Sequence, residues 1–293
     1  MTRSGFVALA GRPNVGKSTL VNAVVGTKVA IVSDKPQTTR RPIRGVATTP
    51  EYQLVLVDLP GVQRPRDVLT ERMQRAVERE MSEADAALMI INGQEGVGPG
   101  DRFIAAALTA AGRPVVVAVN KIDRLDRPRT VLALQAASEL GVGEDVFPVS
   151  ARTGLGVPAL VGHLSRLMPE GPYMFPPEDH SDQSENVMLA ELIREQVLRR
   201  TFQEVPHAVE VIIDHVEHPR DDLSLVRAVA WVEAESQKGI LVGAGGRMIK
   251  AIGTAARKEL QRELGTRVHL DLSVRVRKGW RGDDGLLDRL GIE

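Results

Sequence analysis

The 293-residue sequence contains no cysteine. Disulfide bonds and thiolate metal sites are therefore excluded. Aromatic residues make up only 3% of the chain, so base stacking on aromatic rings can contribute little to any nucleic-acid binding. Apolar runs are short: residues 115–119 fall far short of the roughly 20 needed to span a bilayer. Residues 6–10 are likewise too short for the core of a signal peptide, which leads us to expect a cytoplasmic location.

The formal net charge is zero, from 38 basic and 38 acidic residues. The positive charge is nevertheless concentrated near the C-terminus. Residues 238–281 contain eleven Lys and Arg against three Asp and Glu, a net charge of +8. A neutral chain with one strongly basic segment has the charge distribution expected of a protein that contacts a phosphate backbone. A solvated basic helix is the plainer alternative.

The first 170 residues alternate short apolar runs with longer amphipathic stretches, a pattern typical of an α/β domain. The apolar runs are almost continuous, which indicates a mostly parallel sheet covered by helices on both faces. Apolar periodicity predicts strands over 6–10, 53–58, 86–92, 115–120 and 146–150, and helices over 17–25, 69–82, 101–111, 130–140 and 158–168.

The composition changes after residue 170. Proline and polar residues are frequent and apolar residues show no periodicity, which predicts a linker over 171–186. Residues 1–170 then form one domain and 187–293 a smaller α+β domain with a C-terminal tail. In the second domain we expect, in chain order, a helix over 187–202, strands over 208–216 and 224–235, a helix over 248–263 and a strand over 269–276.

The run from Gly11 to Ser18 matches G-x-x-x-x-G-K-[ST] and stands between a predicted strand and a predicted helix. In this context glycines let backbone N–H groups surround phosphates, Lys17 contacts the β and γ oxygens, and the Ser18 hydroxyl joins a Mg²⁺ shell. The predicted contacts with the nucleotide here are Gly11, Arg12, Pro13, Asn14, Val15, Gly16, Lys17, Ser18 and Thr19.

A second motif, Asp58-Leu59-Pro60-Gly61, follows the next apolar strand. Asp58 is therefore expected at the carboxyl end of that strand, where an α/β sheet presents its ligands. We expect Asp58 to reach Mg²⁺, with Leu59 and Pro60 beside the nucleotide. The Gly61 N–H would contact the γ-phosphate, so the loop after it could respond to that phosphate.

The third motif, Asn120-Lys121-Ile122-Asp123, decides which base is bound. A carboxylate at Asp123 can accept hydrogen bonds from N1–H and the 2-amino group of guanine, whereas adenine would leave it unpaired. Lys121 would pack along the ring, and Asn120 would tie this loop to the phosphate loop. Ser150-Ala151-Arg152, after the last strand, would supply a backbone N–H for the guanine carbonyl.

These motifs in this order resemble those of the translation-factor class of GTPases, and Pro13-Asn14 resembles its TrmE–Era–EngA branch. By this resemblance Gln37-Thr38-Thr39-Arg40 is switch I. Thr39 then binds magnesium, with Thr38 as the alternative, and Asn14 helps to hold K⁺. Lys17, Thr39, Gly61 and Asn14 are thus the expected catalytic residues. Val62 replaces the glutamine that orients water in Ras-type enzymes, so we expect slow intrinsic hydrolysis.

In the basic segment, the apolar run 240–242 is followed by Gly243-Ala244-Gly245-Gly246 and a predicted helix. We interpret the run as strand-like. The arrangement resembles a KH domain, whose G-x-x-G loop clamps single-stranded RNA beside an apolar groove. The expected RNA contacts are Gly243, Ala244, Gly245, Gly246, Arg247 and Lys250.

The domain order, with 191–195, Glu204-Val205-Pro206 and Lys278-Gly279-Trp280, resembles the Era family along nearly the whole chain. That resemblance implies a monomeric GTPase that uses GTP, GDP and Mg²⁺, binds the 3′ end of small-subunit ribosomal RNA and assists assembly of that subunit. It also implies that GTP favours RNA binding, and it allows peripheral association with the inner membrane surface. Two alternatives stay open: a signalling GTPase whose basic tail contacts a membrane, and an RNA-binding assembly factor that uses GTP only as a structural ligand.

Overall fold

The computed structural model describes residues 2–35, 38–61, 65–143, 145–202 and 204–292. Contacts divide the chain into two units. The first comprises Met1–Val32, Thr39–Arg66 and Thr70–Asp182, and the second comprises Ser33–Thr38, Asp67–Leu69 and Gln183–Glu293. Among the described residues, none of the helices combines the length and the low polarity that crossing a bilayer requires.

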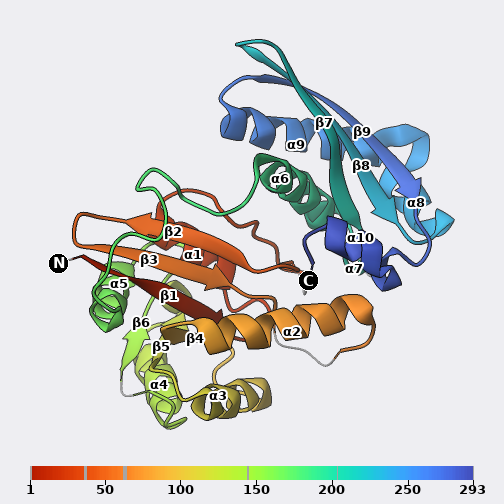
Figure 1. Ribbon diagram of the computed structural model, residues 1–293. Coiled ribbons are helices and arrows are strands. Elements are labelled where there is room, and N and C mark those ends of the chain that lie inside the picture. Colours follow the sequence, from red (N-terminus) through yellow and green to blue (C-terminus); the bar gives the residue numbers. More distant parts are fainter. Residues whose placement is uncertain (1, 36–37, 62–64, 144, 203, 293) are drawn as a thin grey trace. The chain divides into compact units, whose positions relative to one another are not determined.

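The first unit contains a six-stranded sheet with the order β2-β3-β1-β4-β5-β6, in which β2 alone runs antiparallel to its neighbour (Figure 1). Its strands are β1 (Arg3–Ala10), β2 (Ile43–Thr48), β3 (Tyr52–Asp58), β4 (Ala86–Asn92), β5 (Val115–Asn120) and β6 (Val146–Pro148). Its helices are α1 (Lys17–Val25), α2 (Val68–Glu83, which begins in the part assigned to the second unit), α3 (Pro99–Ala111), η1 (Ile122–Arg124), α4 (Arg127–Ser138) and α5 (Val157–Leu167).

Alternating residues of the central strand β1 build two cores, one on each face of this sheet. Val7 and Leu9 pack with apolar residues of α1 and α5. Ala8 packs with residues of α2, and Ala10 with residues of α3 and α4. Burial on both faces explains why these strands consist of nearly continuous apolar residues. The predicted mostly parallel α/β domain is confirmed.

The strand β2 is an element that the sequence reading missed. Its residues, Ile43-Arg44-Gly45-Val46-Ala47-Thr48, contain an arginine and a glycine and so lack a continuous apolar run. Gly45 is needed there because an added Cβ would lie 2.5 Å from Cγ1 of Val21 on α1. Tertiary pairing with β3, and the contact with α1, therefore decide that this segment is a strand.

Residues 169–182, which we call the strap, also differ from expectation. Most of this segment was predicted to be a linker, but it lies along the first unit and belongs to it. The buried side chain of Gln53 holds its middle: Nε2 donates to Phe175 O (2.9 Å), and Oε1 accepts from Met174 N (2.7 Å) and Phe175 N (3.0 Å). Proline-rich composition is compatible with an extended chain pinned by side chains, and it does not by itself make a free linker.

The second unit contains a three-stranded sheet with the order β7-β8-β9, in which β8 is antiparallel to β7 and parallel to β9. Helices α6 and α9 pack together against this sheet. Its elements are α6 (Glu185–Arg200), α7 (Val205–Ala208), β7 (Glu210–Arg220), β8 (Leu223–Val232), α8 (Glu235–Val242), η2 (Ala244–Gly246), α9 (Arg247–Leu264), β9 (Arg267–Val276), η3 (Trp280–Gly282) and α10 (Asp284–Arg289).

The strand-like reading of residues 240–242 was wrong, because they form the last turn of α8. The Gln237 side chain starts this helix by accepting hydrogen bonds from Glu233 N (2.9 Å) and Ala234 N (3.2 Å). Gly243, at φ 71°, ends it. Eight residues with few apolar positions leave too weak a period to distinguish a helix from a strand by sequence.

Candidate functional site

Three of the predicted magnesium ligands meet behind the phosphate loop. Ser18 Oγ donates to Asp58 Oδ2 (2.6 Å), and Thr39 Oγ1 donates to the same oxygen (3.1 Å). The two hydroxyls are 3.4 Å apart. Asp58 lies at the end of β3, Ser18 opens α1, and Thr39 precedes β2. The parallel sheet therefore brings together side chains that are up to 40 residues apart in the chain.

The charges in this cluster fit a bound cation. Burial lowers the pKa of Lys17 and raises the pKa of Asp58, and the opposite charge of each residue opposes the shift of the other. The second carboxylate oxygen, Asp58 Oδ1, is buried without a hydrogen-bond partner among the described residues. A buried carboxylate with an open oxygen beside two hydroxyls is the hard oxygen-donor set that Mg²⁺ prefers. Ser18, Thr39 and Asp58 thus fit Mg²⁺.

The phosphate loop is shaped for close approach of an anion. Lys17 Nζ reaches back to the carbonyl oxygens of Gly11 (3.3 Å) and Arg12 (3.5 Å), which places its ammonium over the loop. Asn14 and Gly16 have positive φ, 63° and 100°, which turns successive peptide groups inward. Asn14 can adopt this conformation because asparagine tolerates the left-handed region better than most residues. The loop therefore combines a lysine ammonium with backbone whose N–H groups can bind an anion.

Three loops are joined by Asn120, at the end of β5. Its Nδ2 donates to Val15 O of the phosphate loop (2.8 Å), while its Oδ1 accepts from Lys121 N (2.8 Å) and Ala151 N (3.0 Å). Lys121, at φ 66°, also donates from Nζ to Asn14 O (2.6 Å). The loops predicted to bind phosphate and base are therefore one connected structure.

The predicted base-reading carboxylate, Asp123, is exposed at this site. Its Oδ1 accepts a hydrogen bond from the buried hydroxyl of Ser150 (2.7 Å), which orients the carboxylate. Ser150 thus has a role that the sequence reading did not assign, since only a backbone N–H was expected from that loop. The Ala151 N–H donates to Asn120 Oδ1, and the next residue, Arg152, is exposed.

Two residues that the sequence predicts near the γ-phosphate lie outside the described residues. They are Gln37 of the predicted switch I and Val62, which follows Gly61. Thr38 and Thr39 are described. Thr38 Oγ1 donates to Lys35 O (2.7 Å), while Thr39 Oγ1 donates to Asp58. This geometry favours Thr39 over Thr38 as the magnesium threonine. Gly61 lies against Pro13, where an added Cβ would be 3.1 Å from Pro13 Cγ.

A second candidate site lies in the second unit, around the loop from Gly243 to Gly246. Gly243, Gly245 and Gly246 have φ of 71°, 60° and 76°, a conformation that other residues adopt at a cost. An added Cβ on Gly243 would lie 2.7 Å from Met248 Cβ, so this glycine is also required by space. Ala244, Arg247 and Lys250 are exposed, and Arg247 Nε donates to Ala244 O (3.2 Å).

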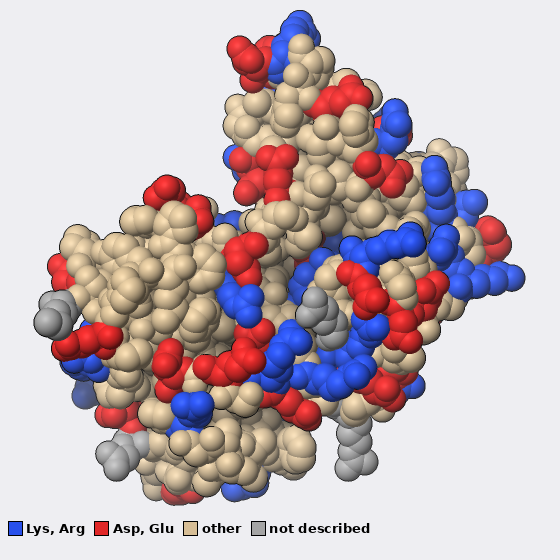
Figure 2. All heavy atoms as spheres, in the orientation of Figure 1, with Lys and Arg blue, Asp and Glu red and all other residues tan. Residues whose placement is uncertain are grey.

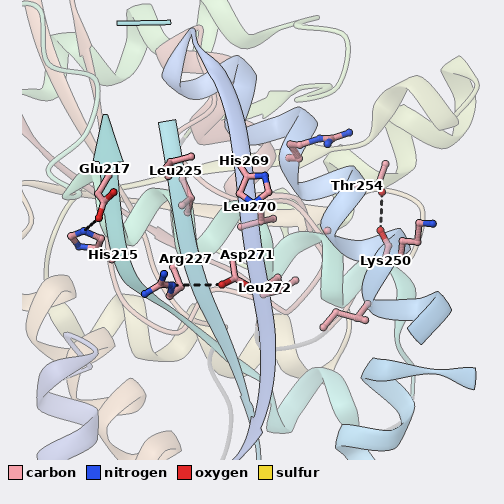
Figure 3. A pocket seen from close by; sticks show the side chains of 14 residues that line it. His215, Glu217, Leu225, Arg227, Lys250, Thr254, His269, Leu270, Asp271 and Leu272 are labelled. Carbon is pink, nitrogen blue, oxygen red and sulfur yellow. Dashed lines mark hydrogen bonds and ion pairs between the residues drawn. The ribbon is translucent and has the colours of Figure 1, made fainter. Parts of the chain in front are cut away.

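A groove of about 550 Å³ lies between α9 and the three strands (Figure 3), and its lining includes Ile249 and Lys250, three and four residues after this loop. Leu225, Leu270, Leu272 and Ile249 give it apolar lining. Its polar side chains come from both sides: His215, Glu217, Arg227, His269 and Asp271 from the sheet, and Lys250, Thr254 and Arg257 from α9. On the face shown in Figure 2, Lys and Arg side chains gather along the right-hand side of the second unit, near α8. A groove that combines leucines with the cations of Arg227, Lys250 and Arg257 can contact bases and phosphates together.

The comparisons agree with both sites. Residues 6–121 match the family model described as 50S ribosome-binding GTPase, and residues 204–281 match the KH domain model. The GTPase Era of Mycobacterium sp. (strain KMS) is 46% identical over 99% of both chains. That of Mycobacterium tuberculosis (strain ATCC 25177 / H37Ra) is 45% identical over 99% of this chain and 98% of its own.

The chain belongs to the Era family of GTPases. Among solved structures it is similar to Era in complex with MgGDPNP and nucleotides 1506–1542 of 16S ribosomal RNA, with a TM-score of 0.94 and 34% identity over 100% of this chain and 99% of that one. It is also similar to a variant of Aquifex aeolicus Era bound to GDP·AlF4⁻, with a TM-score of 0.93 and 33% identity over 99% of each chain. The expected family, the GTPase activity and the fold of a GTPase domain followed by a KH domain are confirmed.

The packing of Gly16 leads to a prediction for this Era-family site. In Gly16→Ala, the new Cβ would lie 2.4 Å from Asn120 Nδ2, at a φ of 100°. We expect affinity for GDP to fall at least about tenfold, because the Asn120 contacts that join the loops must shift. Titration with a fluorescent GDP analogue measures this affinity.

Gly26→Ala is the matched control. Gly26 also has a positive φ, 84°, but nothing lies within 4 Å of its added Cβ. This variant should lose stability and keep its GDP affinity. Equal GDP affinities of the two variants would contradict the role given to Asn120.

Proposed function

We propose that this chain is a GTP-dependent switch that binds the 3′ end of small-subunit ribosomal RNA and assists assembly of that subunit. The observation that carries the proposal is the presence, in one chain, of a phosphate loop joined to a base-reading loop and of a KH-type G-x-x-G loop with exposed cations. The solved Era that resembles it over its full length is in complex with both a GTP analogue and 16S ribosomal RNA. Cytoplasmic location, a monomeric state and peripheral membrane association remain predictions.

In this function each part of the nucleotide site has a defined task. Lys17 and the loop N–H groups bind the phosphates, and Asp123 and Lys121 hold guanine. Ser18, Thr39 and Asp58 would hold Mg²⁺, which offsets the charge of the β- and γ-phosphate oxygens. Because Thr39 joins the cluster from switch I, loss of the γ-phosphate would release that segment.

The base preference can be tested with Asp123→Asn. The amide presents a donor where guanine needs an acceptor, so we expect GTP affinity to fall by roughly 10- to 100-fold, from about 1–3 kcal/mol of lost pairing. Affinity for xanthosine triphosphate should rise, because xanthine has a carbonyl in place of the 2-amino group. Competition binding with both nucleotides measures this change in base preference.

Asp126→Asn provides the control for this charge change. Asp126 lies three residues away and caps α4 by accepting from Arg129 N (2.9 Å). It should leave the base preference unchanged. A GTP affinity that is the same in Asp123→Asn and in the wild type would overturn the proposed base recognition.

We further propose that K⁺ supports turnover through Asn14, which lies in the phosphate loop with a left-handed backbone. GTP turnover should be faster in potassium than in sodium buffer, because K⁺ would offset charge at the β–γ bridge. Asn14→Ala should remove that difference. Phosphate release assays measure both, with Lys17→Ala as the inactive reference. Identical rates in the two buffers would refute the potassium proposal and leave the GTPase intact.

RNA binding by the second unit makes a separate prediction. The double variant Arg247→Ala/Lys250→Ala removes two exposed cations beside the G-x-x-G loop. For a single-stranded RNA with the 3′-terminal sequence of small-subunit ribosomal RNA, we expect weaker binding and a salt dependence reduced by about one unit of slope per lost phosphate contact. Filter binding at several salt concentrations tests this.

Arg220→Ala is the matched control, since Arg220 is an exposed arginine at the far end of β7 that pairs with Asp222 (3.8 Å). It should bind RNA like the wild type. Binding of the protein to vesicles that contain anionic lipids is measured in parallel, to test the alternative that the basic segment contacts a membrane. Binding to vesicles without RNA binding would favour the signalling GTPase instead.

A further inference from the structure

The strap is held to the first unit in two different ways, as its green trace beside β2 and β3 in Figure 1 allows the reader to follow. Its middle is anchored by the buried Gln53 side chain, through the three hydrogen bonds described above. Its last residues pair with the edge strand β2: Val46 N donates to His180 O (2.9 Å), and Gly45 and Ser181 form an antiparallel bridge. The end of the strap thus adds a very short antiparallel segment to the sheet at the edge strand β2.

Arg44, also on β2, connects this end to two other elements. Its Nη1 donates to Asp182 Oδ2 (2.9 Å), and its Nη2 donates to both carboxylate oxygens of Glu80 on α2 (2.8 and 2.9 Å). The Glu80 side chain is only 6% exposed, whereas those of Arg44 and Asp182 are 31% and 25% exposed. One guanidinium therefore joins β2, α2 and the last residue of the strap.

The strengths of these contacts differ. A buried carboxylate that accepts two charge-assisted hydrogen bonds holds Arg44 on α2 firmly. The Arg44–Asp182 pair is partly solvated, and such pairs contribute little to stability. The end of the strap is also held by two backbone pairings and by the Arg44 N–H, which donates to Asp182 Oδ1 (3.3 Å). Loss of the contacts with β2 would release the end of the strap while Arg44 stays bound to Glu80 and the middle stays bound to Gln53.

The elements that hold the end of the strap adjoin both nucleotide-sensing segments. β2 begins four residues after Thr39, and α2 follows the loop that starts at Gly61. In this structure Thr39 contacts Asp58 (3.1 Å), as expected when magnesium and three phosphates are bound, and the end of the strap is paired with β2. The two arrangements therefore occur together.

Detachment would lengthen the chain between α6 and the last attachment of the strap to β2 or Gln53. With the end of the strap bound, two residues, Gln183 and Ser184, separate Asp182 from α6 and span at most about 7 Å. With residues 180–182 released from β2, this segment begins at the Gln53 anchor at Phe175. The nine residues 176–184 can span about 30 Å.

We propose that residues 180–182 form a clasp on β2 that is closed while Thr39 occupies the magnesium site and opens after GTP hydrolysis, and that its state sets how far the RNA-binding domain can move. This inference rests on the proposed GTP-dependent RNA binding. It assigns to Asp182 and Arg44 a role in coupling rather than in binding either ligand.

Hydrogen exchange tests the clasp directly, because the Val46 amide is bonded to it. Mass spectrometry of peptides covering β2 should show exchange at least about fivefold faster with GDP than with a non-hydrolysable GTP analogue. Asp182→Ala should give fast exchange with both nucleotides. Glu178→Ala, an exposed acid in the same strap, should behave like the wild type. Equal exchange in the two nucleotide states would overturn the proposal.

A disulfide lock tests the consequence for RNA. The natural chain has no cysteine, so Arg44→Cys/Asp182→Cys introduces one possible pair, at directly opposed positions on β2 and the strap. When oxidised, this variant should bind the 3′-terminal RNA with GDP as tightly as with the GTP analogue, within about twofold, and reductant should restore the difference.

The outcomes separate the clasp from the proposed function. A nucleotide dependence of RNA affinity that persists in the oxidised lock overturns the clasp and leaves the RNA-binding switch in place. Absence of RNA binding in the wild type overturns the proposed function. In that case the exchange measurement still decides whether the clasp opens with the nucleotide state.

Discussion

The nucleotide site depends on the hydrogen bonds of one buried amide. Asn120 donates to the phosphate loop and accepts from its own loop and from the loop at Ala151. Each loop alone is a short irregular segment, and positive φ at the non-glycine residues Asn14 and Lys121 costs free energy. Such conformations persist when surrounding contacts determine them, and Asn120 supplies those contacts from a strand fixed in the sheet core.

The arrangement of the parallel sheet explains why a few side chains are enough to build the nucleotide site. β1, β3 and β5 run parallel, so the segments that follow them emerge at the same edge. The phosphate loop, Asp58 and Asn120 follow these strands in turn. A cation site and a base site are consequently built from residues far apart in sequence, with Lys17 and Asp58 balancing one another in a buried place. In the second unit, glycines with positive φ form the loop at 243–246, and both apolar and charged side chains line the groove between α9 and the sheet.

The sequence predicted those parts whose physical signal is local. Gly11 to Ser18 can be recognised because the phosphate contacts need glycines and a lysine at fixed spacing, and Asp123 because guanine needs an acceptor there. Elements without such a signal were missed. Residues 240–242 resemble a strand in sequence, although Gln237 caps a helix that ends at Gly243. β2 was missed because Arg44 and Gly45 interrupt its apolar pattern. The role of the Ser150 hydroxyl was missed because it meets Asp123 only through the fold.

The amino-acid sequence by itself determined the chemistry of this protein: which nucleotide parts its motifs can bind, the order of its two domains and the concentration of positive charge near its C-terminus. These follow from residue type and spacing, which a linear chain displays in full. The tertiary structure alone decided that the Ser150 hydroxyl meets Asp123, and that the proline-rich strap lies against the first unit. Both outcomes depend on hydrogen bonds between residues distant in the chain, Ser150 with Asp123 and Gln53 with Phe175, and no local pattern encodes such pairings.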